Sequence, residues 1–242
     1  HELKDPISIV ETGAQMLLKK QKRFGPLTER QAKTVNRIVR NAAKARQMLY
    51  SLLEVGRAET GSFSCGRFNP ALTGYEVLLE CLELQAPDTA DEVRNIQQQE
   101  AALDHLNASG IYFTTAPEFE NLMVLQDETK FRQIACNLIK NALHYRSERL
   151  ELRLEVENDV FVMDVIDDGP GIPDKHQESI FKRYTQASEC RLNIRNGHGL
   201  GLAGARILAR SLGGNIQVFS RKNDGATFRL MMPLRFADTA NI

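Results

Sequence analysis

The sequence predicts a helical hairpin followed by a two-layer α/β sandwich. The first observation is that residues 1–61 repeat apolar residues at helical spacing and lack the alternation of a strand. The second is that helical and strand patterns alternate from Phe68 onward. The third is composition, since 242 residues with 42% hydrophobic and 26% charged residues can bury the core of a globular protein. We therefore expect two domains, over residues 1–61 and 62–242.

The first domain carries a heptad seam on two helices. Its apolar residues step alternately by three and four, before and after a break at residues 24–26: Leu3, Ile7, Val10, Ala14 and Leu17, then Val35, Ile38, Ala42, Ala45, Leu49 and Leu52. Thr28 with Gln31 predicts a capping box for the second helix, and Gly61 predicts its end. One hairpin cannot bury these seams alone, so we expect a homodimer with a four-helix bundle. The alternative is a monomer whose hairpin rests on the second domain.

The sequence pattern of the second domain predicts a mixed sheet with helices on one side. Its patterns indicate helices over 70–86, 91–107, 128–145 and 199–213, and strands near 110–115, 122–126, 150–156, 160–166, 215–220 and 226–233. Residues 168–198 are rich in glycine, polar and charged residues, which is typical of a long loop.

Charge, hydropathy and cysteine spacing exclude several classes of function. Lys+Arg and Asp+Glu number 31 each, so no overall field attracts nucleic acid or an anionic membrane. No run reaches the roughly 18 apolar residues that span a bilayer. The pattern starts inside a helix without Met, so we expect a fragment whose membrane anchor, if any, lies upstream. The cysteines lack metal-ligand spacing and are expected to be idle thiols in a reducing cytoplasm: Cys65, Cys81, Cys136 and Cys190.

The helix at 128–145 has an unusual polar stripe. Lys130, Asn137, Asn141 and His144 fall on a face separate from its apolar residues. Asparagine is a poor helix former, so packing does not explain the pair. An amide oxygen is a suitable neutral ligand for Mg²⁺ beside substrate phosphates. A solvated helix face is the alternative.

Two glycine-rich segments could hold a ligand. Residues 167–173 read DDGPGIP directly after a buried strand, where glycine permits close backbone approach and a carboxylate can accept from an exocyclic amine such as that of adenine. Residues 197–202 read GHGLGL at the start of a helix, where N–H groups can face phosphates. The second segment is neither a P-loop nor a dinucleotide fingerprint. A tight loop and an ordinary glycine-rich turn are the alternatives.

The chain opens with HELKDP. His1 lies off the seam and is expected to face solvent, where Glu2 can accept its proton as the other ring nitrogen attacks phosphorus. Pro6 removes a backbone hydrogen bond and bends the helix. An exposed histidine without function is the alternative.

Together these motifs resemble the sensor histidine kinases of two-component systems over nearly the whole chain. The segments that carry the resemblance are HELKDP (the H box), residues 127–145 (the N box), DDGPGIP (the first glycine box), residues 180–184 (the F box), GHGLGLAGA (the second glycine box) and residues 225–228. The resemblance implies a HisKA dimerisation and phosphoacceptor domain and a HATPase_c domain, the sandwich shared with gyrase, Hsp90 and MutL.

The resemblance also implies roles for individual residues. His1 would be the phosphoacceptor, Glu2 its base and Asn141 the Mg²⁺ ligand. Residues 174–196 would form a lid over ATP. The residues implied to bind ATP are Asn137, Asn141, His144, Tyr145, Asp167, Gly169, Gly171, Ile172, Gly197, Gly199, Leu200, Gly201 and Thr227.

Four features depart from the family pattern. His144 stands where many members have a phosphate-contacting Lys, and Gln186 where some have Arg. Asp5 stands where members with phosphatase activity often have Thr or Asn. Residues 87–107 look like an insertion to which the sequence assigns no function.

The function implied is transfer of the γ-phosphoryl group of MgATP to His1, and then to an aspartate of a response-regulator receiver domain. One alternative is a degenerate kinase that docks receivers as a non-catalytic scaffold. A second is an ATPase or chaperone-like relative, which is disfavoured because those relatives have an acidic base where this chain has Asn137, and they lack an H box.

Overall fold

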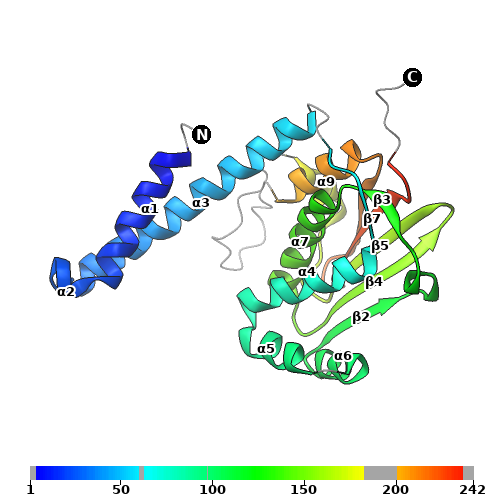
Figure 1. Ribbon diagram of the computed structural model, residues 1–242, viewed down its shortest axis with the longest axis horizontal. Helices are drawn as coiled ribbons and strands as arrows, with labels where there is room; N and C mark the ends of the chain where they lie inside the picture. Colours follow the sequence, from blue (N-terminus) through cyan, green and yellow to red (C-terminus); the bar gives the residue numbers. More distant parts are fainter. Residues whose placement is uncertain (1–3, 60–62, 97, 183–200, 237–242) are drawn as a thin grey trace.

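The computed structural model describes residues 4–59, 63–96, 98–182 and 201–236. Figure 1 shows a hairpin of helices projecting from an α/β sandwich. The long helix of this hairpin reaches the sandwich at one end. The first residues of the chain, including His1 and Glu2, lie outside the described residues.

The hairpin consists of α1 (Lys4–Lys19), the short α2 (Gln21–Phe24) and α3 (Glu29–Glu59). Gly25, with φ of 85°, follows α2 in a conformation that favours glycine. The predicted capping box is confirmed, because Gln31 Oε1 accepts from the Thr28 N–H at 2.8 Å while the Gln31 N–H donates to Thr28 Oγ1 at 3.3 Å. The helices α1 and α3 then run side by side (Figure 1).

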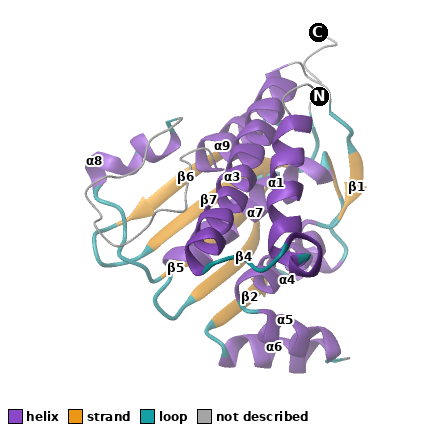
Figure 2. Cartoon of the chain, turned by 90° about the vertical axis from the view of Figure 1, so that its left-hand side faces the viewer, coloured by secondary structure: helices purple, strands orange, loops and turns teal. Residues whose placement is uncertain are grey.

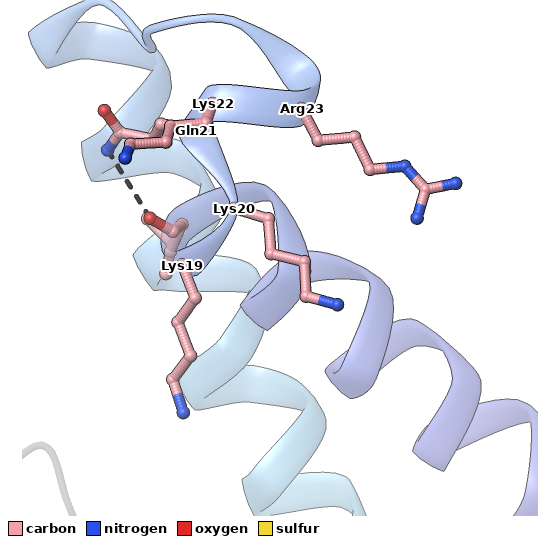
Figure 3. A pocket seen from close by; sticks show the side chains of 6 residues that line it. Lys19, Lys20, Gln21, Lys22 and Arg23 are labelled. Carbon is pink, nitrogen blue, oxygen red and sulfur yellow. Dashed lines mark hydrogen bonds between the residues drawn. The ribbon is translucent and has the colours of Figure 1, made fainter.

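The turn between α1 and α3 carries a surface hollow lined by residues 18–23. Figure 3 shows the long side chains of Lys19, Lys20 and Arg23 extending from this turn, and the side-chain amide of Gln21 donating to a backbone carbonyl. In Figure 1 this end of the hairpin lies far from the sandwich, so its basic side chains form a solvated tip away from the sheet and its helices.

The sandwich contains a five-stranded sheet in the order β2-β4-β5-β7-β6, parallel between β2 and β4 and antiparallel elsewhere. The strands are β2 (Ile111–Thr115), β4 (Leu150–Glu157), β5 (Val160–Asp167), β6 (Asn215–Ser220) and β7 (Ala226–Pro233). A separate antiparallel pair joins β1 (Gly66–Phe68) to β3 (Val124–Gln126).

Three helices cover one face of the sheet (Figure 2). They are α4 (Pro70–Gln85), α7 (Glu128–Tyr145) and α9 (Gly201–Ser211). The core lies between the layers, where Phe131 of α7, Phe161 of β5 and Phe228 of β7 are almost completely buried. The predicted two-layer α/β sandwich is therefore confirmed. None of the helices in the described part of the chain combines the length and hydropathy of a membrane span.

The prediction of one helix over 91–107 was wrong. The segment folds as α5 (Pro87–Asn95) and α6 (Gln99–Ala108). Val93 and Ala102 are both buried, yet in one continuous helix they would fall on opposite sides. The chain therefore breaks between them, at Ile96 and Gln98, which both have extended backbone. The remaining short elements are η1 (Pro117–Glu120), α8 (Asp174–Gln177) and η2 (Ser179–Phe181).

Candidate functional site

The helix α7 places the polar stripe beside the core. Its N-terminus is capped by Asp127, whose Oδ1 accepts from the Lys130 N–H at 3.0 Å. One face of the helix is buried against the sheet. Asn137 and Asn141 are half-buried and one turn apart, whereas His144 is exposed. The two amide side chains therefore stand together at the border of the core.

The first glycine-rich segment begins with a buried carboxylate. Asp167 is the last residue of β5, is 5% exposed, and accepts from the Gly169 N–H at 3.0 Å. Burial raises the pKa of Asp167 to about 6, although the N–H groups of Gly169 and Ala226 oppose the shift. An ionised carboxylate here is costly unless a further donor reaches it. The residue is therefore suited to a ligand that supplies a hydrogen-bond donor.

The neighbouring carboxylate, Asp168, points elsewhere. It accepts from the backbone N–H groups of Ser147 and Glu148 at 2.8 and 3.1 Å. Partial burial raises the pKa of Asp168, but donation from these groups and from the Arg149 N–H lowers it overall. Asp168 thus fastens the chain after α7 to the end of β5. The resemblance had singled out Asp167, and burial is the physical difference between the two acids, since Asp167 is buried and Asp168 is exposed.

The glycines of this segment allow the loop to pack tightly. A Cβ on Gly169 would collide with the Tyr145 carbonyl, and one on Gly171, with φ of 66°, would collide with the Arg221 carbonyl. The loop is tied to the turn before β7, because the Gly225 N–H donates to the Gly169 carbonyl at 3.1 Å. These glycines are therefore required by close packing of the backbone against other parts of the chain, whereas the predicted approach to a ligand stays a prediction.

Asn137 reaches the second glycine-rich segment. Gly201 is the first residue of α9, and a Cβ there would lie 3.4 Å from Asn137 Oδ1. The stripe of α7 therefore faces the start of α9, where backbone N–H groups and the helix dipole favour negative charge.

The two glycine-rich segments bracket the stripe. Tyr145 lies beside Gly169, and Asn137 lies beside Gly201. These contacts are eight residues apart on α7, or about 12 Å along its axis, with Asn141 between them. The arrangement suits an elongated ligand with a donor at the Asp167 end and negative charge at the α9 end.

Other predicted residues border the same region. Thr227 pairs with Ile166 in the ladder between β5 and β7, so it neighbours Asp167. Ile172 is half-buried, and its N–H donates to Ser220 Oγ at 2.8 Å. The His144 ring meets the Tyr145 ring edge-on, with centroids 4.9 Å apart. Predicted residues that lie outside the described part of the chain are His1, Glu2, Gly197, Gly199 and Leu200.

The sequence missed a second contact of Asp127. Its Oδ2 accepts from the Ser64 N–H at 2.9 Å, so the cap of α7 also holds the segment that follows α3. Phe63 of that segment packs against Phe236, with ring centroids 5.1 Å apart. The base of the hairpin is therefore attached directly to the helix that carries the polar stripe.

Known proteins resemble this arrangement. Residues 126–236 match the family described as histidine kinase-, DNA gyrase B-, and HSP90-like ATPase. The circadian input-output histidine kinase CikA of Synechococcus elongatus is 29% identical over 236 residues, which is 96% of this chain and 29% of CikA. The chain is thus similar to sensor histidine kinases over nearly its whole length. The sensor protein KdpD of Escherichia coli is 26% identical over 98% of this chain and 24% of KdpD.

Solved histidine kinases share the fold of this one. Full-length ShkA in complex with AMPPNP superposes with a TM-score of 0.68 at 22% identity, covering 96% of this chain and 44% of ShkA. The Acinetobacter baumannii histidine kinase AdeS gives 0.57 at 19% identity, covering 97% of this chain and 98% of that structure. The chain thus spans less than a third of the length of CikA and KdpD.

Proposed function

We propose that this chain is the core of an ATP-dependent protein-histidine kinase that binds MgATP, phosphorylates its own His1 and passes the phosphoryl group to an aspartate of a response-regulator receiver domain. The observation that carries the proposal is the span of α7 between a buried carboxylate and the start of α9. The whole-chain similarity to CikA and KdpD supports it.

Asp167 binds the adenine end in this proposal. Its buried carboxylate accepts a hydrogen bond from the exocyclic amine of adenine. This amine replaces the water donors that the carboxylate loses on burial. Gly169 and Gly171 shape the adenine pocket, because they let the loop pack closely against the backbone of Tyr145 and Arg221. Ile172 and Thr227 flank the base from the loop and from β7.

The α9 end binds the phosphates. Asn137 and Gly201 lie together there, and the N–H groups of the first turn of α9 favour negative charge. Gly197, Gly199 and Leu200 precede this helix in the chain and complete the phosphate site in the proposal. Positioning and charge neutralisation supply most of the catalysis in phosphoryl transfer.

Asn141 holds Mg²⁺ through its amide oxygen, between the two ends of the site. The donor is of the right kind, because Mg²⁺ prefers hard oxygen ligands together with substrate phosphates. Among the described residues, no three His, Cys, Asp or Glu side chains gather into a site that would hold a metal alone. When bound, the ion neutralises charge on the transferring phosphoryl group. His144 and Tyr145 close this side of the site.

The hairpin dimerises in this proposal, with residues 1–61 as the dimerisation and phosphoacceptor domain and residues 62–242 as the ATP-binding domain. Apolar side chains remain exposed on the single hairpin, including Ile9 at 71% and Val10 at 52%. A second hairpin would bury them in a four-helix bundle. Figure 1 shows α1 and α2 projecting from the sandwich, while α3 contacts α9. The projecting part of the hairpin is therefore not covered by its own sandwich.

Autophosphorylation tests the proposal. We expect incubation with γ-labelled ATP and Mg²⁺ to label the chain in an acid-labile, alkali-stable form, as phosphohistidine requires. The label should disappear in His1→Gln and in Asn141→Ala. The matched control is Asn107→Ala, an exposed asparagine on α6, which should label normally. Labelling that survives His1→Gln would overturn the assignment of the phosphoacceptor.

The receiver-docking scaffold remains the second candidate. The exposed His144, in place of a phosphate-contacting Lys, favours it. A scaffold would bind a receiver domain and give no labelled chain, whereas an ATPase would release free phosphate without labelling. The same incubation therefore separates all three functions when free phosphate is measured beside the label.

A further inference from the structure

Two cysteines meet across the interface between α4 and α7. Cys81 Sγ lies 3.6 Å from Cys136 Sγ, although the residues are 55 positions apart in the chain. Cys81 is 1% exposed, and Cys136 is half-buried. Their surroundings are the hydrophobic core between these helices. The fold therefore brings together two thiols whose spacing in the sequence indicated no pairing.

The distance is short enough for a covalent bond. A disulfide requires about 2.05 Å between the sulfurs, so an approach of about 1.5 Å joins them. Each cysteine comes from a different helix, so rotation of the two side chains and a small shift of one helix supply that approach. Disulfides of this type in reducing compartments are usually transient and redox-sensing.

Cys136 is the thiol that reacts first. The Cys81 thiol donates a hydrogen bond that lowers the pKa of Cys136, burial raises that pKa, and the Lys140 ammonium one turn along α7 lowers it again. The thiolate is the nucleophile in thiol oxidation. Cys136 is also the more exposed of the two, so it meets a small oxidant while Cys81 stays protected.

We propose that Cys81 and Cys136 form a reversible disulfide in response to hydroperoxides. The Cys136 thiolate attacks the peroxide, so that a sulfur–oxygen bond forms, the oxygen–oxygen bond breaks and the leaving oxygen takes a proton as alcohol or water. Cys81 then attacks the sulfenic acid at Cys136. The sulfur–sulfur bond forms, the sulfur–oxygen bond breaks, and water leaves with the Cys81 proton. Two thiols are oxidised by two electrons, and one peroxide is reduced.

The disulfide would act on the nucleotide site through α7. Asn137 follows Cys136 directly and lies beside Gly201, with Asn141 one turn further. Tying α7 to α4 shifts these side chains by a fraction of the 1.5 Å approach. We expect oxidation to weaken nucleotide binding about fivefold, since displacements near 1 Å in such sites have large effects. This second step rests on the proposed function, whereas formation of the disulfide does not.

Peptide mapping tests the bond itself. The intact chain is treated with dilute hydrogen peroxide, its remaining thiols are alkylated, and it is digested without reduction. We expect a linked pair of peptides containing Cys81 and Cys136, which dithiothreitol separates. Cys65→Ser is the control, because the exposed Cys65 lies outside the pair and its loss should leave the link intact. Cys136 recovered as sulfinic acid without a linked peptide would overturn the proposal, as would disulfides that join separate chains alone.

Calorimetry tests the coupling. The affinity of reduced and oxidised chain for an ATP analogue is compared with that of Cys81→Ala, which cannot form the bond and should bind equally under both conditions. A mapped disulfide with unchanged affinity would overturn the coupling to α7. Reduced chain that binds no nucleotide would instead overturn the proposed function, and the peptide map would still decide whether the dithiol exists.

Discussion

The hairpin and the sandwich differ in how completely a single chain buries them. In the sandwich, Phe131, Phe161 and Phe228 lose almost all contact with solvent. Among the described side chains of the hairpin, only Ala14, Val35 and Ala42 are buried apolar residues, while larger ones such as Ile9, Met16 and Ile38 stay exposed. Small cores are hard to stabilise because burial rises with size. The sandwich can therefore fold from one chain, whereas the hairpin gains by pairing with a second copy.

The largest effect is expected in the core of the sandwich. Phe131→Ala removes a ring that packs against Phe68 and Phe161, with centroids 5.4 and 5.6 Å away. We expect it to lower the free energy of unfolding by about 3–5 kcal/mol, measured by denaturant titration at several protein concentrations. Phe219→Ala, at a ring that is 53% exposed, is the control and should cost below about 1 kcal/mol. Equal costs would remove the contrast between core and surface.

A substitution in the seam of the hairpin should change the stability of the dimer. Val10 is a seam residue that is 52% exposed in the single chain, so Val10→Asp would bury an unpaired carboxylate in a four-helix bundle. We expect the free energy of dimerisation to weaken by about 3 kcal/mol. This raises the dimer dissociation constant, measured by sedimentation equilibrium, more than a hundredfold. Thr12→Asp, on another side of the same helix, should leave the dimer intact. A wild-type chain that sediments as a monomer would contradict the predicted four-helix bundle.

Asp167 should show the largest effect on ligand affinity. Asp167→Asn offers the adenine amine a donor in place of an acceptor, so we expect a loss of roughly 1–3 kcal/mol in binding of an ATP analogue by titration calorimetry. Asp88→Asn changes an exposed acid in the first turn of α5, outside the site, and serves as the control. Unchanged affinity in Asp167→Asn would remove this residue from the adenine pocket.

The same substitution should stabilise the sandwich without nucleotide. Burial raises the pKa of Asp167 from 3.8 to about 6, so its contribution to stability is present below pH 3.8 and is lost as the pH rises through 6. Asparagine does not ionise, so the variant keeps this stability as the pH rises. We expect Asp167→Asn to exceed wild type by roughly 1–2 kcal/mol at pH 8, with the gap closing between pH 6 and pH 4. Thermal unfolding across that range measures the gap. A gap independent of pH would mean that the carboxylate is not destabilised by burial.

Local patterns predicted the parts of the fold and site that lie close together in the chain. The seam, the capping box at Thr28 and the stripe of α7 follow from spacings of three and four. The buried strand before Asp167 follows from a nearly continuous run of apolar residues. The break between α5 and α6 was not predicted, because no glycine or proline marks it and only the buried positions of Val93 and Ala102 require it.

Long-range features escaped prediction for a different reason. The Cys81–Cys136 pair and the contact of Asp127 with Ser64 each join residues more than 50 positions apart. The resemblance did select Asp167 and not Asp168, but the burial that separates the two is not encoded by their residue type. The bracketing of α7 by two glycine-rich segments needed the packed fold, although each segment was evident from its composition.

The smallest effect is expected at Asp5, in the first turn of α1, where the side chain is exposed. Its family counterparts in members with phosphatase activity are often Thr or Asn, which can orient a water toward the phosphoryl group of the regulator. An ionised Asp5 donates no hydrogen bond and repels that group. At a separation of ~6 Å the repulsion between unit charges is roughly 0.7 kcal/mol in water, and the exposure of Asp5 favours this lower limit over the value of about 3 at an effective dielectric near 20.

We therefore expect Asp5→Asn and Asp5→Thr to speed decay of a purified phospho-regulator by a few fold, while self-phosphorylation stays near wild type. Val10→Asp, which perturbs the same helix without touching this charge, separates a specific gain from general loosening. Wild type that dephosphorylates the regulator as fast as both Asp5 variants, and well above spontaneous decay, would show that the carboxylate does not limit the reaction.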